Sequence, residues 1–265
     1  MIDKAVILAA GIGKRMSPGG EASRAGGVPK PLLPLDASGV TFLDWHVRAL
    51  RAAGAKEITI VGSPATFGKK DGVRWVMNDF PGDQSGSGHS THLAFTSDPP
   101  ILDGRSRVVL MDADVVYDAT LFADLANAPG ARSKTLVCGR FRETAEEVMV
   151  FADAQGKPRV HGKGLLGTPL VSGLSCLGEA TGLLLLEPGD HASWRAASAW
   201  CMQYLTSKTR SEHEDITQRL MLVSALDAVV FTDDTRFMEC DTPEEYEVAR
   251  REMVPRWLPH LPRPG

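Results

Sequence analysis

Paired cysteines, long apolar runs and clusters of positive charge are all missing from this sequence. Its four cysteines form no Cys-x-x-Cys pair and have no histidine at zinc-ligand spacing, so a zinc site is not expected. Buried, reduced cysteines are expected instead, which fits a cytoplasmic protein. No apolar stretch approaches about eighteen residues, so no segment is expected to span a membrane.

The charge balance excludes a further class of function. Lys and Arg number 29 against 33 Asp and Glu, which gives a net charge of −4, and no basic run is present. Such a protein has no electrostatic footprint for non-specific nucleic-acid binding. With 265 residues, 43% hydrophobic and 23% charged, the chain is expected to be an ordinary globular protein of one large domain or two small ones. Glycines and cations interrupt the N-terminal apolar run too soon for a signal peptide.

The strongest signal lies in the N-terminal stretch. An apolar run over residues 5–8 predicts a buried strand, and a turn of small residues follows it. Small side chains let a ligand approach the backbone closely, and successive N–H groups in such a turn form a concave anion site. The residues expected to bind a nucleotide here are Leu8, Ala9, Ala10, Gly11 and Gly13. Arg15 and Lys30 supply matching positive charge, arginine as a bidentate fork and lysine as a point charge.

Two common nucleotide-binding motifs do not fit this turn. A dinucleotide-binding turn needs Gly-x-Gly-x-x-Gly, but Met16 stands at the position of the third glycine. A P-loop needs four residues between its glycines and then Gly-Lys-Ser/Thr, which is absent. Leu-Ala-Ala-Gly-x-Gly-x-Arg-Met at residues 8–16, followed by Pro-Lys-Pro-Leu at residues 29–32, resembles instead the opening of the nucleotidyltransferases that activate sugar phosphates and related small phosphates. An ordinary glycine-rich turn is the plainer alternative.

The order of the expected elements indicates an α/β fold. A helix is expected from about Thr41, where Thr41 and Asp44 fit a capping box, and a strand follows over residues 56–61. Strand, helix and strand in this order imply a parallel sheet with a right-handed crossover. Further strands are expected over residues 74–77, 107–111, 134–140 and 147–151, with a hairpin turn at residues 156–157. Further helices are expected near residues 87–96 and 118–126, after Gly189 and from Thr242.

A pair of carboxylates follows the strand at residues 107–111. Asp112 and Asp114 project to the same side of an extended segment, at the carboxyl end of a strand, where open α/β sheets bind ligands. Such a pair suits Mg²⁺, which keeps phosphates and waters as its other ligands, although a simple turn is the alternative. In the nucleotidyltransferases that the chain resembles, the metal-binding Asp follows an apolar strand and a small residue. Asp114 fits that position best, and Asp112 lies beside it at the nucleotide.

The resemblance also implies a second metal ligand and the residues around the base. Asp241 precedes a Thr-Pro helix start and matches the family's second metal-binding Asp. Mg²⁺ is therefore the expected cofactor, with Mn²⁺ as a substitute. The loop that holds the nucleotide base in these enzymes is matched by Gln84, Ser87 and Gly88.

One stretch narrows the resemblance to a branch. Gly-Glu-Ala-x-Gly at residues 178–182, followed by an apolar run, looks like the phosphocholine cytidylyltransferase-like branch, which also handles aminoalkylphosphonates and other small phosphonates. In that branch Glu179 would line the acceptor pocket.

Two acceptor chemistries stay open. Cations that could bind a doubly anionic acceptor are Arg140, Arg142, Arg159, His161 and Lys163, with Lys163 the foremost candidate. Acidic residues that could face an acceptor amine are Glu179, Glu214 and Asp215. Trp200 and Tyr204 stand four residues apart on an expected helix; an aromatic cage for a quaternary ammonium is possible there, but a core pair is favoured.

The fold that the resemblance implies is a Rossmann-like GT-A nucleotidyltransferase fold, a mostly parallel mixed sheet flanked by helices, with a small acceptor-binding β subregion. Residues 1–253 would form one domain, with a nucleotide-binding half at 1–130 and an acceptor-binding half at 131–235. Residues 254–265 would form a C-terminal tail, either a strap or disordered.

The activity that the resemblance implies is cytidylyl transfer from CTP to phosphocholine, aminoethylphosphonate or another small phosphonate, with release of pyrophosphate. Arg15 would stabilise the β- and γ-phosphates, and Lys30 would contact the α-phosphate or the acceptor oxygen. The alternatives are a sugar-1-phosphate nucleotidyltransferase that uses UTP, dTTP or GTP, a glycosyltransferase of similar fold, and a non-catalytic nucleotide-binding protein. The oligomeric state is left open, with a homodimer as one option.

Overall fold

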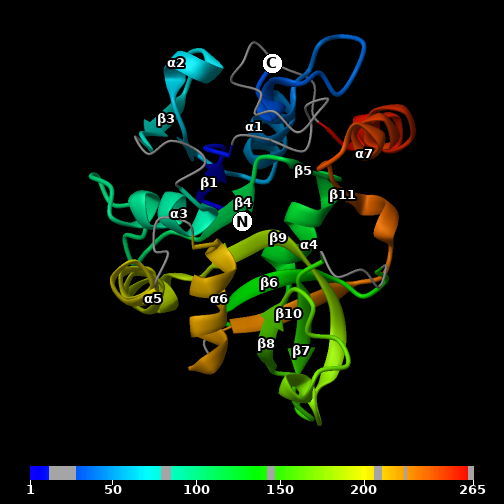
Figure 1. The fold of residues 1–265 in the computed structure, drawn as a ribbon. Helices are drawn as coiled ribbons and strands as arrows, with labels where there is room; N and C mark the ends of the chain where they lie inside the picture. Colours follow the sequence, from blue (N-terminus) through cyan, green and yellow to red (C-terminus); the bar gives the residue numbers. More distant parts are fainter. Residues whose placement is uncertain (12–27, 79–84, 142–146, 206–210, 224–225, 262–265) are drawn as a thin grey trace.

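The computed structural model describes residues 1–11, 28–78, 85–141, 147–205, 211–223 and 226–261 (Figure 1). Its strands are β1 (Lys4–Leu8), β2 (Glu57–Val61), β3 (Val73–Val76), β4 (Val108–Asp112), β5 (Val115–Tyr117), β6 (Ser133–Cys138), β7 (Met149–Ala152), β8 (Pro158–Gly162), β9 (Ser175–Leu186), β10 (Leu226–Phe231) and β11 (Phe237–Glu239).

The helices follow the expected order, with short turns between them. The α-helices are α1 (Phe42–Ala52), α2 (Pro64–Phe67), α3 (Ser87–Phe95), α4 (Thr120–Asn127), α5 (His191–Tyr204), α6 (His213–Leu222), α7 (Pro243–Val248) and α8 (Val254–Trp257). The 3-10 turns are η3 (Lys30–Leu32), η4 (Pro169–Val171), η5 (Pro188–Asp190), η7 (Asp234–Arg236) and η9 (Leu258–His260), and η8 (Ala249–Met253) is π-helical.

The described strands build one main sheet in the order β10-β6-β9-β4-β1-β2-β3, with the β7–β8 hairpin attached to β9. β1 lies parallel to β2 and β4, β2 lies parallel to β3, and β10 lies parallel to β6, whereas β9 runs antiparallel to β4 and β6. The expected mostly parallel mixed sheet is thus confirmed. Its register places Leu8 beside Asp112, so the turn after β1 and the carboxylates after β4 share one edge of the sheet.

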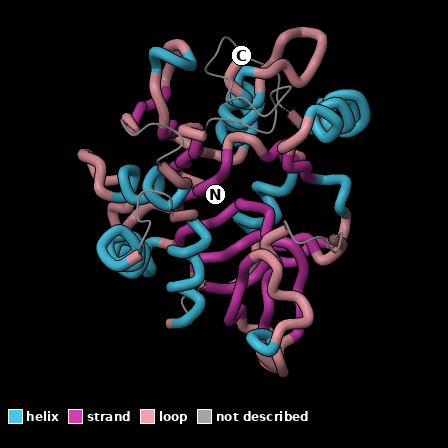
Figure 2. Tube along the Cα trace, in the orientation of Figure 1, coloured by secondary structure: helices cyan, strands magenta, loops and turns pink. Residues whose placement is uncertain are grey.

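Helices cover both faces of this sheet (Figure 2). One hydrophobic cluster joins Ile7 of β1 to side chains of α1, α4 and α8, among them Trp45, Phe122 and Trp257. The other joins Val6 of β1 to side chains of α3, α5 and α6, among them Phe95, Trp194 and Ile216. A parallel strand buried on both faces explains the continuous apolar run of β1.

The capping box expected at Thr41 is present, and the helix start expected at Thr242 is a capping box as well. At the start of α1, Thr41 Oγ1 accepts from the Asp44 backbone N–H, and the Asp44 carboxylate accepts from the Thr41 N–H. At the start of α7, Thr242 and Glu245 make the same reciprocal pair. The hairpin turn expected at residues 156–157 is also confirmed, because it joins β7 to β8.

The C-terminal segment packs against the core as far as it is described. Val254, Trp257 and Leu261 are buried, and the Trp257 ring lies 6.3 Å from that of Trp45, measured between centroids. Residues 254–261 therefore act as a strap across α1. No described helix combines the length and the apolar character that crossing a lipid bilayer requires.

Candidate active site

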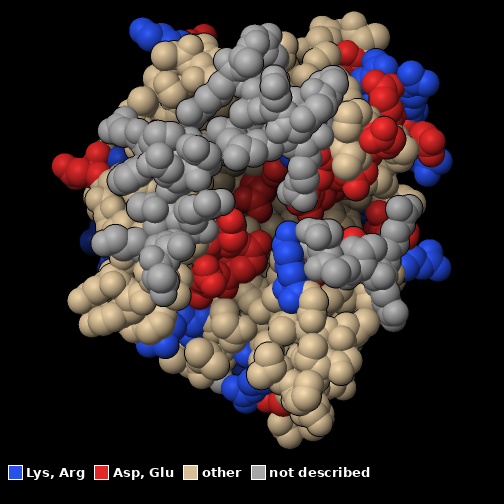
Figure 3. All heavy atoms as spheres, viewed as in Figure 1, with Lys and Arg blue, Asp and Glu red and all other residues tan. Residues whose placement is uncertain are grey.

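A cleft of about 530 Å³ opens at the carboxyl ends of β1 and β4. Its walls come from the turn after β1, η3, the start of α3, the residues after β4, the end of β8, the first turn of α6 and β11. Asp and Glu side chains gather in the hollow at the middle of this face (Figure 3). Open α/β sheets bind ligands at this edge, so the cleft is the candidate active site.

The turn after β1 lines the cleft as expected, with Leu8, Ala9, Ala10 and Gly11. Its backbone is tied to the neighbouring strand, because the Ala113 N–H donates to the Leu8 carbonyl at 3.1 Å. A Cβ atom added to Gly11 would meet no protein atom within 4 Å, so the space above this residue is open. Gly13 and Arg15 lie outside the described residues.

Lys30 is buried at the floor of the cleft, with only 6% of its surface exposed. Its Nζ donates to Asp114 Oδ2 and to Asp241 Oδ1, each at 3.0 Å. Burial alone would lower the pKa of Lys30, but the attraction of these two carboxylates outweighs burial and raises that pKa above its usual value. The Lys30 side chain therefore stays protonated and carries a permanent positive charge.

Strand pairing brings Asp241 to this place from more than a hundred residues away. β11 pairs antiparallel with β5, with Glu239 opposite Val115. Beyond that pair, the Cys240 N–H donates to the Asp114 carbonyl at 3.1 Å. The two expected metal ligands thus belong to adjacent backbone segments.

The Asp114 and Asp241 carboxylates fit part of a Mg²⁺ site. Because both oxygens lie 3.0 Å from one nitrogen, they are at most twice that distance apart. Mg²⁺ usually takes one or two protein carboxylates and completes its shell with phosphate oxygens and waters. No group of three or more His, Cys, Asp or Glu side chains in the described ranges has the arrangement of a metal centre, so substrate and water would supply the other ligands.

Excess negative charge in the cleft supports this fit. Burial, with the nearby Asp114 carboxylate, raises the pKa of Asp112 to about 7. Burial and repulsion by Asp241 and Asp114 raise the pKa of Glu239, which lines the cleft, to about 9. Lys30 and the other nearby cations therefore balance only part of the charge, and a divalent cation would favour the ionised forms.

His213, at the start of α6, is a second buried cation in the cleft wall. Its Nδ1 lies 3.0 Å from Glu214 Oε2, and its Nε2 lies 3.7 Å from Asp112 Oδ2. Burial would lower the pKa of His213, but these two carboxylates raise it to about 10. An imidazolium is therefore held between the strand that carries Asp112 and the helix that carries Glu214.

The residues expected around the base join α3 to α6. Ser87 lines the cleft, but its hydroxyl and its backbone N–H both donate to Glu212 Oε2, at 2.6 and 3.2 Å. The Gly88 N–H donates to the Ser211 carbonyl at 2.8 Å, and a Cβ on Gly88 would lie 2.5 Å from Ser211 Oγ. Gly88 therefore serves the packing of two helices and does not line the cleft. Gln84 lies outside the described residues.

The acceptor candidates lie together on the other side of the cleft. Lys163, Glu214 and Asp215 line it. Glu179 lines a smaller adjoining cavity of about 60 Å³, which shares Lys163 and Glu214 with the cleft. The structure thus places all four acceptor candidates within one connected region.

Other cations and rings of the middle section lie elsewhere. Arg159 pairs with Asp153 at 2.7 Å, and the exposed Arg140 is 3.9 Å from Asp234, while neither lines the cleft. Arg142 lies outside the described residues. The Trp200 ring packs 5.4 Å from Tyr204 with the Arg219 guanidinium over it, again away from the cleft lining. Of the expected cations, His161 and Lys163 line the cleft. Burial lowers the pKa of His161, so this histidine is neutral and Lys163 is the expected cation that remains there among the described residues.

Comparison with known proteins places the chain in a family. A family profile described as "MobA-like NTP transferase domain" matches residues 5–185, from β1 almost to the end of β9. The chain belongs to the MobA-like NTP transferase family. The nucleotidyltransferase resemblance of its opening motif is thereby confirmed, and the α6 and β11 parts of the cleft lie beyond the matched residues.

The chain is similar to one curated protein in sequence and to one solved structure in fold. The N-acetylmuramate alpha-1-phosphate uridylyltransferase of Neisseria meningitidis serogroup B is 32% identical over 139 residues, which cover 47% of this chain and 52% of the relative. The chain thus spans about half the length of that curated relative. The structure of the inositol-1-phosphate CTP transferase from T. maritima has a TM-score of 0.68 at 15% identity and matches over 96% of both chains. That likeness confirms the expected nucleotidyltransferase fold.

Two ionisable residues of the cleft with strongly raised pKa values, Glu239 and His213, were not expected from the sequence. Glu239 stands two positions before Asp241 on β11, and this short spacing was the available signal. His213 lies between Glu212 and Glu214 in the sequence, and a histidine among first-turn acids of a helix carries no signal of its own. Both residues acquire their surroundings only when distant segments pack together.

Proposed function

We propose that this protein is a cytidylyltransferase, which moves CMP from CTP to a small phosphate- or phosphonate-bearing acceptor and releases pyrophosphate. The observation that carries the proposal is the buried Lys30 ammonium bonded to Asp114 and Asp241, beside the small-residue turn after β1, in a chain of the MobA-like NTP transferase family. Nucleotidyl transfer needs such a meeting of fixed positive charge, metal-binding carboxylates and open backbone around a triphosphate.

The reaction requires that the two substrates are positioned for in-line attack and that positive charge stabilises the phosphate oxygens. An anionic oxygen of the acceptor attacks the α-phosphorus in line; the new O–P bond forms as the bond to the β-phosphate oxygen breaks, and pyrophosphate leaves with that electron pair. The attacking oxygen is already deprotonated at neutral pH, so no general base is required. Lys30 would contact the α-phosphate or the acceptor oxygen, and Arg15 would stabilise the β- and γ-phosphates.

Asp114 and Asp241 would hold the Mg²⁺ expected for this reaction, with Mn²⁺ as a substitute. When bound, the ion supplies positive charge to the phosphate oxygens. Asp112 would lie at the nucleotide, kept in place by His213.

The choice of nucleotide rests on two relatives that point in different directions. The T. maritima neighbour is a CTP transferase, which agrees with the branch that residues 178–182 resemble. The Neisseria relative is a uridylyltransferase for a sugar phosphate, and it supports uridylyl transfer to a sugar-1-phosphate as the second candidate.

The cleft wall supports an amine-bearing acceptor. Its described lining contains no Phe, Tyr or Trp, and the adjoining cavity has a single ring, Phe237, so a cation–π cage for a quaternary ammonium gains little support. Glu214 and Asp215 offer hydrogen-bond acceptors for a primary amine, and Lys163 offers a cation for the acceptor's phosphonate oxygens. Among the branch's acceptors, 2-aminoethylphosphonate fits this wall better than phosphocholine.

The test is pyrophosphate release with Mg²⁺, measured for four nucleoside triphosphates against 2-aminoethylphosphonate, phosphocholine, carboxylated phosphonates and sugar-1-phosphates. Release with CTP and 2-aminoethylphosphonate is expected, with at least about a 100-fold loss in Asp114→Asn. Release only with UTP and a sugar phosphate would support the second candidate. No release with any pair would overturn the enzymatic proposal.

A further inference from the structure

The Lys30 side chain occupies the place between the two carboxylates that are proposed to bind the metal. Its Nζ lies 3.0 Å from an oxygen of Asp114 and 3.0 Å from an oxygen of Asp241. Mg²⁺ would bind such oxygens at about 2.0–2.1 Å, in the same space. An ammonium and a divalent cation cannot both lie there, because they would overlap and repel each other.

The backbone around this bridge is held in place. Lys30 begins η3, where the Leu33 N–H donates to the Lys30 carbonyl at 3.0 Å. Asp241 is fixed by Glu245 Oε2, which accepts from the Asp241 backbone N–H at 2.8 Å. The Asp114 carbonyl accepts from the Cys240 N–H. The main chain thus fixes both carboxylate-bearing segments, whereas the lysine side chain has four rotatable bonds with which to leave.

We propose that Lys30 is an internal counter-cation, which pairs with Asp114 and Asp241 before substrate binds and exchanges places with the divalent cation when the nucleotide arrives. This inference rests on the proposed function, because it takes these two residues as the metal ligands. The released ammonium then lies within reach of the incoming phosphates and exchanges two carboxylate partners for a phosphate partner. When a metal ion binds without nucleotide, the displaced Lys30 ammonium finds no phosphate partner. The affinity of the nucleotide-free protein for the metal ion is therefore weak.

The test is Mn²⁺ binding to the nucleotide-free protein, measured by titration calorimetry and by the electron paramagnetic resonance signal of free Mn²⁺. Lys30→Met removes the competing charge and is expected to bind Mn²⁺ at least about tenfold more tightly than the wild type, since two charge-assisted hydrogen bonds no longer have to break. The matched control is Lys70→Met, which removes a lysine bonded to Asp44 at 2.6 Å outside the cleft. Its Mn²⁺ affinity is expected to equal that of the wild type.

Asp114→Asn and Asp241→Asn distinguish failure of this inference from failure of the metal assignment. Equal or weaker Mn²⁺ binding by Lys30→Met, together with loss of binding in the two Asp variants, would overturn the exchange and leave the metal ligands in place. Unchanged binding in both Asp variants would overturn the metal assignment itself.

Lys30→Met leaves two carboxylates without their cation, and this loss can also destabilise the folded protein. Lys30→Gln, which keeps hydrogen-bond donors, serves as the second variant. For both, the melting temperature is measured against Mn²⁺ concentration. The exchange predicts a steeper rise with Mn²⁺ than in the wild type, and parallel curves would contradict it.

Discussion

Single residues decide how the charged groups of the cleft are placed, and one of them is a glycine. Gly182 of β9 has φ +74°, and a Cβ at this position would lie 2.6 Å from Asp112 Oδ2. The missing side chain therefore leaves room for the Asp112 carboxylate. Gly182 contributes to the site through geometry, although it has no chemistry of its own.

Replacing Gly182 by Ala is expected to displace Asp112 and to lower kcat/KM for pyrophosphate release about tenfold or more, since small misplacements at a reacting centre are costly. Gly173→Ala is the matched control: its φ of +78° carries a similar backbone penalty of about 1–2 kcal/mol, but a Cβ there meets nothing within 4 Å. Urea unfolding measures the loss of stability that both variants share, and steady-state assays measure the difference in kcat/KM between them. Equal kinetics in the two variants would refute the role given to Gly182.

At the scale of elements, the sequence predicted those helix starts that depend on interactions between residues close together in the chain. The capping residues Thr41 and Thr242 start α1 and α7 because each box needs only residues a few positions apart. The pairing of β11 with β5 depends on segments more than a hundred residues apart, so the sequence around Glu239 did not show that this residue would lie close to Asp114. Its short spacing from Asp241 was the local indication. Arg159 was expected near the acceptor for its charge alone, and its partner Asp153 lies within its own hairpin.

The contact between α3 and α6 caps the N-terminus of α3 with a side chain from α6. α3 has no capping side chain of its own, and Glu212, the N-cap residue of α6, accepts from the Ser87 N–H and hydroxyl. An exposed carboxylate at a helix N-terminus also favours the helix dipole. One side chain thus stabilises the starts of both helices that form this wall of the cleft.

A double-mutant cycle with Ser87→Ala and Glu212→Ala tests this contact. Each single variant is expected to lower the free energy of unfolding by about 1 kcal/mol, as loss of a helix cap does. The double variant is expected to lose less than the sum of the two, because each single change already breaks the same contact. Chemical denaturation of the four proteins gives the coupling energy, and strict additivity would show that the contact contributes nothing.

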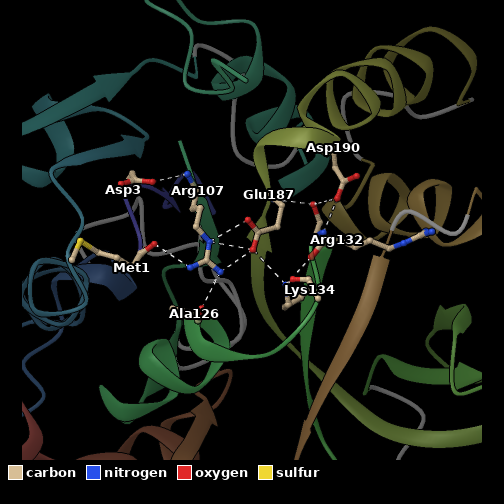
Figure 4. A network of polar contacts seen from close by, with 10 residues as sticks. Met1, Asp3, Arg107, Ala126, Arg132, Lys134, Glu187 and Asp190 are labelled. Atoms are coloured by element: carbon tan, nitrogen blue, oxygen red, sulfur yellow. Dashed lines mark hydrogen bonds and ion pairs between the residues drawn. The ribbon is translucent and has the colours of Figure 1, made fainter. Parts of the chain in front are cut away.

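At the scale of the whole molecule, the charged groups at the two ends of the sheet differ in whether they are balanced within the protein. The carboxyl ends of β1 and β4 carry an imbalance of charge that a ligand can relieve, as the raised pKa values of Asp112 and Glu239 show. At the opposite ends of β4, β6 and β9, a buried polar network is satisfied within the protein (Figure 4). There the Arg107 guanidinium and the Lys134 ammonium both contact Glu187 Oε1, at 2.8 and 3.4 Å.

This division predicts that Glu187→Gln affects stability and leaves catalysis unchanged. Lys134 is fully buried, and removal of the Glu187 charge leaves both cations without their carboxylate, which is expected to cost about 3 kcal/mol of unfolding free energy. Denaturation measures this cost, while kcat/KM per folded molecule is expected to match the wild type because Glu187 does not line the cleft. Glu57→Gln, which removes a 65% exposed partner of Lys4, is the control and is expected to cost less than about 1 kcal/mol. A stable Glu187→Gln protein with impaired turnover would mean that the two ends of the sheet are coupled.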